Sequence, residues 1–131
     1  IFFTEARINT LPPHLIQPHI QQRDEVAQRM SAVIKSGIKY AVGTDGMHGG
    51  IAQEMKYLTD FGASAASAIR AATIHAAMVC GMENEIGTLK TGKVADLIGV
   101  EGNPFDDINA LIRVKTVIQA GKIVRFNKNQ N

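Results

Sequence analysis

The sequence feature that most constrains the fold is a helical segment followed directly by a short apolar run and a glycine-rich loop. Between about residues 22 and 36, apolar side chains recur at helical spacing, and Gly37 is suited to the end of a helix. Residues 38–43 are mostly apolar and end at a glycine, which predicts a β-strand. A helix, a turn and a strand form half of an α/β repeat, whose strands are usually parallel and covered on both faces. We therefore expect an α/β fold.

The remaining elements divide the chain near Met82 into an α/β part and a mostly β part. Three prolines within residues 1–21 predict that this stretch is irregular. Apolar periodicity predicts helices over 51–61, over 65–72 with Ser64 as the N-cap, and from Thr73 to before Gly81. It predicts strands over 94–100, 114–119 and 123–126, and a short helix or extended link over 108–112. A hairpin turn is expected at Ala120–Gly121.

Composition narrows the class of protein. The chain has 131 residues, of which 45% are hydrophobic and 20% charged, as in a globular domain. Its net charge is only +2 and its basic residues are scattered, so we expect no nucleic-acid partner. No apolar run approaches the roughly 20 residues of a membrane span, so we expect no membrane partner. The single cysteine, Cys80, lies in an Ala-rich stretch, which predicts a buried, unreactive thiol and a reducing, cytoplasmic location.

The glycine-rich loop after the predicted strand carries the candidate catalytic residue, Asp45. In α/β sheets and barrels, functional groups gather where loops leave the C-terminal ends of the strands. A carboxylate at such a position is able to bind a metal or to act as a general base on a metal-bound water. The alternative is an aspartate that caps the next helix or braces the turn at Gly46. His48, in the same loop, is placed to reach a substrate or a metal, or is a plain surface residue.

The other histidines supply no second metal ligand close in the sequence. His75 lies in an Ala-rich helical stretch and is expected to be a packed or capping residue, whereas His14 and His19 flank proline-rich chain. The chain contains no His-x-His pair. Because Asp45 alone would hold a metal weakly, the sequence provides one ligand of a metal site.

Two glycine-rich segments have partial likeness to phosphate-binding motifs. The glycines within residues 43–50 precede a predicted helix, where an anion is able to bind, but they lack the G-x-G-x-x-G spacing. Residues 87–93 match the first seven positions of the P-loop pattern, yet Val94 follows where a serine or threonine is required. A strand is also expected next, in place of a helix. We therefore interpret residues 87–93 as a turn that leads into a strand.

The order of these features is similar to that of the amidohydrolase superfamily. Residues 39–45, Lys-Tyr-Ala-Val-Gly-Thr-Asp, resemble the eighth-strand signature of that family, which ends in Gly-Thr-Asp or Gly-Ser-Asp. Residues 68–77 resemble the helix that follows this strand. Residues 85–98 resemble the run in which the chain leaves the barrel and enters a small β-sandwich, and residues 114–124 resemble the last hairpin of that sandwich. The resemblance extends over roughly residues 25–125.

The resemblance implies a fold and an activity. Residues 1–81 would be the C-terminal part of a (β/α)8 TIM-barrel catalytic domain, with its last strand and helices, and residues 82–131 the C-terminal half of a β-sandwich composite domain. Asp45 would bind the catalytic metal, usually zinc, take a proton from the attacking water and pass it to the leaving amine during hydrolysis of a C–N bond. The loop most resembles that of the prolidase-like branch, which implies dipeptide or N-acyl amino acid substrates. Imidazolonepropionase-like enzymes share much of the same C-terminal sequence. His48 and Gly46 would contact the substrate.

The resemblance also implies parts that these residues do not contain. A barrel needs about 250 residues, and the family's His-x-His and its ligands on other strands are absent from this sequence. We therefore expect an amidohydrolase segment that is inactive alone and that uses one or two divalent metal ions together with ligands from elsewhere. The rest of the barrel, or another copy in a homo-oligomer, would cover its exposed strand. The alternative is a stand-alone, non-catalytic α/β module with an interaction or structural role.

Overall fold

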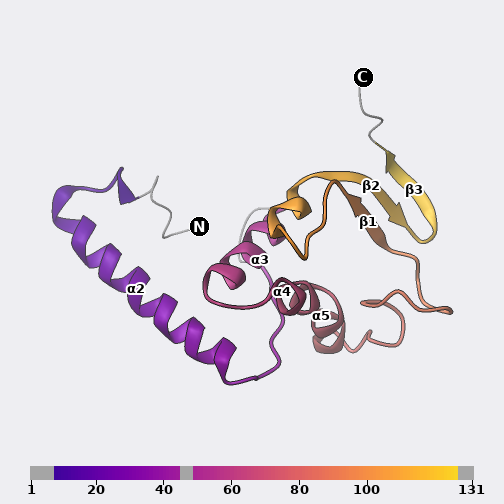
Figure 1. The fold of residues 1–131 in the computed structure, drawn as a ribbon, viewed down its shortest axis with the longest axis horizontal. Coiled ribbons are helices and arrows are strands. Elements are labelled where there is room, and N and C mark those ends of the chain that lie inside the picture. Colours follow the sequence, from indigo (N-terminus) through magenta and orange to yellow (C-terminus); the bar gives the residue numbers. More distant parts are fainter. Residues whose placement is uncertain (1–7, 45–48, 127–131) are drawn as a thin grey trace. The chain divides into compact units, whose positions relative to one another are not determined.

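The computed structural model of the chain describes residues 8–44 and 49–126 (Figure 1). Ile1–Ile38 form one compact unit and Lys39–Asn131 form a second. The first unit is dominated by one long helix. The second contains three short helices, a 3-10 helix and a three-stranded antiparallel sheet. The coarse expectation of a chain built from helices and strands is confirmed, but every strand pairing among the described residues is antiparallel.

Helix α2 (Pro13–Lys35) begins earlier than the prolines predict. Pro13 occupies the first helical position, where the fixed φ of proline suits a helix and its missing N–H would have no partner in any case. Pro18 lies inside the helix, so the prediction that residues 13–21 are irregular is wrong. One lost hydrogen bond is tolerated because the helix continues for many residues beyond it. The helix ends at Ser36 and Gly37, as expected, and Gly37 has a φ of 73°.

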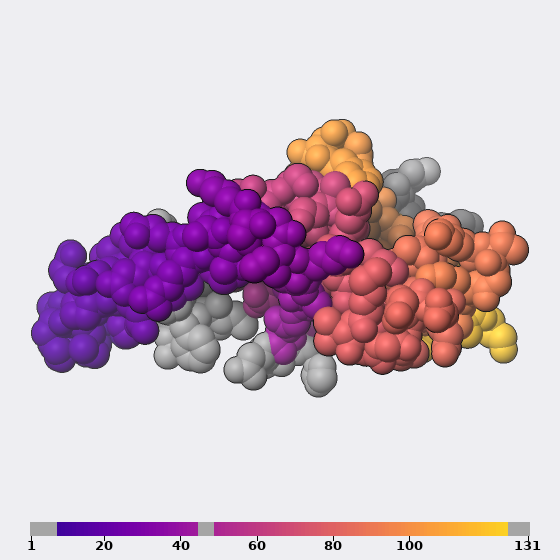
Figure 2. Space-filling model, turned by 90° about the horizontal axis from the view of Figure 1, so that it is seen from below, coloured from indigo at the N-terminus to yellow at the C-terminus, as the bar shows by residue number. Residues whose placement is uncertain are grey.

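Helix α2 has no buried residue. Its side chains, coloured indigo to purple in the space-filling view of Figure 2, are exposed or half-buried. His14 is exposed and His19 half-buried on this helix. No helix in the described ranges has the length and apolar character needed to cross a membrane.

The three helices of the second unit match their predictions. They are α3 (Ile51–Asp60), α4 (Ala65–Ala72) and α5 (Ile74–Val79). The Ser64 hydroxyl accepts a hydrogen bond from the Ser67 backbone N–H at 3.1 Å, as an N-cap should. Helix α3 packs against α4 and against the 3-10 helix η1 (Ile108–Ile112). The buried core of this unit is small and contains Met55, Leu58, Ala63, Ala68, Ala71, Ala77, Ile108 and Ala110.

The sheet has the order β1-β2-β3, with strands β1 (Leu97–Val100), β2 (Val114–Gln119) and β3 (Lys122–Phe126). Strands β2 and β3 form the expected hairpin, in which Gln119 pairs with Lys122. Both turn residues have positive φ, 47° at Ala120 and 78° at Gly121, as a two-residue hairpin turn of the primed type requires. The sheet therefore forms from segments that are close together in the sequence.

The predicted strand over residues 38–43 does not form. These residues belong to neither helix nor strand, and no strand lies beside them in the part of the chain that the structure describes. A strand exists only when a neighbour provides the hydrogen-bonding ladder, and here the backbone bonds to helices instead.

The expectation that Cys80 is buried is also wrong. The thiol is free and exposed, because α5 ends at Val79 and Cys80 stands at its C-cap, outside the packed face of the helix.

Candidate functional site

The predicted site residues Asp45, Gly46 and His48 lie outside the described residues. The structure describes the two segments that flank them, residues 38–44 before the loop and Gly49 with α3 after it. The residue at the N-cap of α3 is Gly50, whose carbonyl accepts the N–H groups of the first helical turn. Both interpretations of Asp45, as a catalytic carboxylate and as a cap or turn brace, concern a residue outside the described ranges. Its catalytic role stays a prediction.

Residues 39–44, which lead to Asp45, are attached to α4 and α5 by three hydrogen bonds. The Tyr40 hydroxyl lies 3.2 Å from the Ser67 hydroxyl of α4. The Tyr40 carbonyl lies 3.0 Å from Nδ1 of His75 in α5. The Val42 N–H donates to the carbonyl of Ala71 at 3.1 Å. These contacts link the segment to helices and not to a strand.

The Ala71 carbonyl is able to accept the Val42 N–H because it lies at the C-terminal end of α4. The last carbonyls of a helix have no partner inside it. The Thr73 hydroxyl donates to the Ile69 carbonyl at 2.8 Å, and the Thr73 N–H donates to the Arg70 carbonyl at 3.2 Å. The next carbonyl, that of Ala71, takes the Val42 N–H. Ala68 and Ala71 of α4 are fully buried, and their small side chains permit a neighbouring segment to lie close to the helix.

His75 is the packed residue that the sequence predicts. It is half-buried on the first turn of α5. A carbonyl oxygen only accepts, so Nδ1 must carry the proton in this contact. The sequence did not indicate that the acceptor is the backbone of Tyr40, 35 positions earlier, because no periodic pattern reports a contact of that range.

The segment that partly matches the P-loop pattern is a turn, as predicted. The Lys93 amine donates to the carbonyls of Glu83 and Ile86, the latter at 3.1 Å, so it faces the loop's own backbone. The Val94 N–H donates to the Glu85 carbonyl at 2.9 Å, and strand β1 follows. No helix N-terminus follows residues 87–93, so the phosphate-binding interpretation has no structural basis here.

Asp96 joins the entry of the sheet to its hairpin. Its carboxylate accepts the Ala120 N–H at 2.7 Å, and the Ala95 carbonyl accepts the Gly121 N–H at 3.1 Å. A carboxylate that accepts a backbone N–H makes a relatively strong hydrogen bond. Asp96 is therefore a structural residue that supports a turn whose Ala120 adopts a conformation rare for residues other than glycine.

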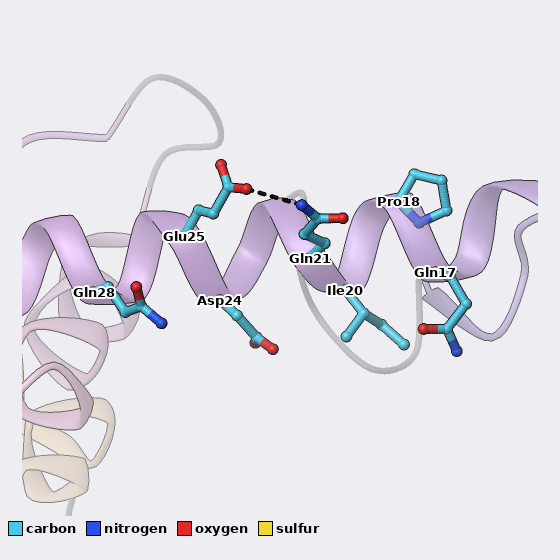
Figure 3. A pocket seen from close by; sticks show the side chains of 7 residues that line it. All are labelled: Gln17, Pro18, Ile20, Gln21, Asp24, Glu25 and Gln28. Atoms are coloured by element: carbon cyan, nitrogen blue, oxygen red, sulfur yellow. Dashed lines mark hydrogen bonds between the residues drawn. The ribbon is translucent and has the colours of Figure 1, made fainter.

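Each unit has a hollow among its described residues. The first lies on α2 and is lined by polar side chains with Pro18 and Ile20; Gln21 donates to Glu25 at 3.1 Å across it (Figure 3). The second, of about 990 Å³, lies between α4, α5 and the sheet and is lined largely by apolar residues, with the Cys80 thiol at its wall. Its one carboxylate, Asp96, is already engaged by the hairpin. Neither hollow gathers a set of catalytic groups.

Within residues 8–44 and 49–126, no three His, Cys, Asp or Glu side chains are grouped so as to hold a metal ion. The described residues therefore do not form a metal site by themselves.

A protein-family model and a known enzyme both match this sequence. The model of the amidohydrolase family matches residues 4–124. Ochratoxinase from Aspergillus niger is 33% identical over 102 residues, which cover 76% of this chain and 21% of that protein.

Solved structures agree with this assignment. A Xaa-Pro dipeptidase with methionine bound in its active site has 31% identity and a TM-score of 0.77, over 92% of this chain and 31% of that chain. The structure of A. niger ochratoxinase has 29% identity and a TM-score of 0.75, over 90% of this chain and 28% of that one. The chain thus spans about a fifth to a third of the length of these relatives. Because the family model matches almost all of its sequence, this chain belongs to the amidohydrolase family.

Proposed function

We propose that this chain supplies one catalytic carboxylate, Asp45, to an amidohydrolase active site that hydrolyses C–N bonds. The observation that carries the proposal is the family match over residues 4–124, within which Gly43-Thr44-Asp45 follows a segment attached to α4 and α5. Asp45 is the metal ligand and the proton carrier of the reaction: its carboxylate accepts the proton of the attacking water and delivers it to the leaving amine. A bound divalent ion, zinc in this proposal, makes the hydroxide available near neutral pH.

The relatives support a substrate class. We propose dipeptides or N-acyl amino acids, since a Xaa-Pro dipeptidase is among the similar structures and the loop after Asp45 most resembles that of the prolidase-like branch. Gly46 and His48 are proposed to contact the substrate, because they share a loop with Asp45. The Gly46 backbone permits close approach of a ligand, and His48 offers a side chain that donates or accepts hydrogen bonds.

The remaining parts of the proposal concern the whole protein. Residues 1–81 would complete a TIM barrel and residues 82–131 one half of a β-sandwich, and the rest of the barrel or a second copy would cover the exposed apolar surface. Exposure supports this: Val79 is 77%, Leu89 84% and Ile123 65% exposed in the chain as described. We keep the cytoplasm as the proposed location.

The first test is to read the coding DNA upstream of Ile1. A continuous frame of about 250 residues, with a His-x-His near its start, is the expected result. A start codon directly before Ile1 would leave the alternative, a stand-alone module without catalysis.

The second test is Asp45→Asn in the complete, metal-loaded protein. We expect kcat for dipeptide or N-acyl amino acid hydrolysis to fall by about 10²–10⁴-fold or more, because the amide neither carries the proton nor ligates the metal as a carboxylate does. Asp60→Asn is the matched control, since Asp60 is an exposed carboxylate paired with Lys56 on α3. Full activity of Asp45→Asn would refute the assigned role.

A further inference from the structure

We draw no further inference here: the strongest candidate, the apolar hollow between α4, α5 and the sheet, carries none, because nothing among the described residues shows what covers it.

Discussion

At the scale of single residues, most of the polar side chains with a defined role in this chain support turns and loop ends. Asp96 accepts from the hairpin turn, Lys93 donates to loop carbonyls, and His75 donates to the Tyr40 backbone. Asp107 accepts from the backbone and side chain of Asn109 at the start of η1. In each case at least one partner is a backbone group that regular structure leaves unsatisfied, which is why these residues lie at element boundaries.

Glu101 gives a prediction at this scale. Lys115 Nζ lies 2.9 Å from a Glu101 carboxylate oxygen, and this hydrogen bond, together with the positive charge of Lys115, holds the pKa of Glu101 below its ordinary value of 4.5. A lowered pKa means that the contribution to stability is present above pH 4.5 and is lost as the pH falls through the folded-state pKa. We expect Lys115→Met to return the pKa of Glu101 toward 4.5, as measured by carbon NMR of the carboxyl groups.

Asp107 is the internal control for this titration. Its pKa is lowered chiefly by the Asn109 side chain, then by the Asn109 N–H and by Arg113, so Lys115→Met should leave it in place. A pKa of Glu101 that is the same with and without Lys115 would contradict the assigned cause.

At the scale of elements, the loop between α5 and β1 is packed tightly at one point and open at another. Gly87 has φ of +86°, and a Cβ built there would lie 2.8 Å from the Ala77 Cβ and 3.0 Å from the Ile74 Cα of α5. Gly92, in the same loop, has φ of +87° with nothing within 4 Å of a built Cβ. The two glycines therefore share a conformation but differ in their surroundings.

This pair separates backbone strain from close packing. We expect Gly92→Ala to lower the free energy of unfolding by about 1 kcal/mol, because an L-residue with a side chain is disfavoured at positive φ. Gly87→Ala should lower it by a further ~1–3 kcal/mol, because α5 must move away from the loop. Chemical denaturation of both variants measures the difference, and equal losses would show that Gly87 does not approach α5 closely.

At the scale of the whole molecule, the chain has more apolar surface than its own residues cover. Among the described residues, the core of the second unit is small and consists mostly of alanine, while large side chains such as Val79, Leu89 and Ile123 are exposed. An apolar hollow of about 990 Å³ lies between its helices and the sheet. Surfaces of this kind are normally covered by other protein segments.

We expect the 131-residue chain, expressed alone, to self-associate or precipitate, and to stay in solution when it is co-produced with the remainder of an amidohydrolase barrel. Sedimentation velocity over a concentration series measures this association, with Leu89→Lys as a variant that should weaken it if the exposed apolar surface is responsible. A monomer that unfolds cooperatively at every concentration would favour the stand-alone module instead.

The elements whose causes are local could be predicted from the amino-acid pattern. The spacing of Met55 and Leu58, the Ser64 cap and the Ala120–Gly121 turn depend on neighbours a few residues away, so α3, α4 and the β2–β3 hairpin were predictable. The Gly-Thr-Asp motif and its surroundings likewise indicated the family. They identified Asp45 as the candidate catalytic residue, and this role stays a prediction.

The other features could not be predicted in this way, because they depend on contacts between residues far apart in the chain or on what surrounds a residue in the fold. Residues 38–43 have the composition of a strand but bond to α4 and α5, since a strand requires a neighbour that no local pattern specifies. Likewise, Pro18 lies inside α2, and Cys80 is exposed at the C-terminal end of α5. The link from His75 to Tyr40 belongs to the same class, because two distant elements must fold together before one side chain is able to hold the other's backbone.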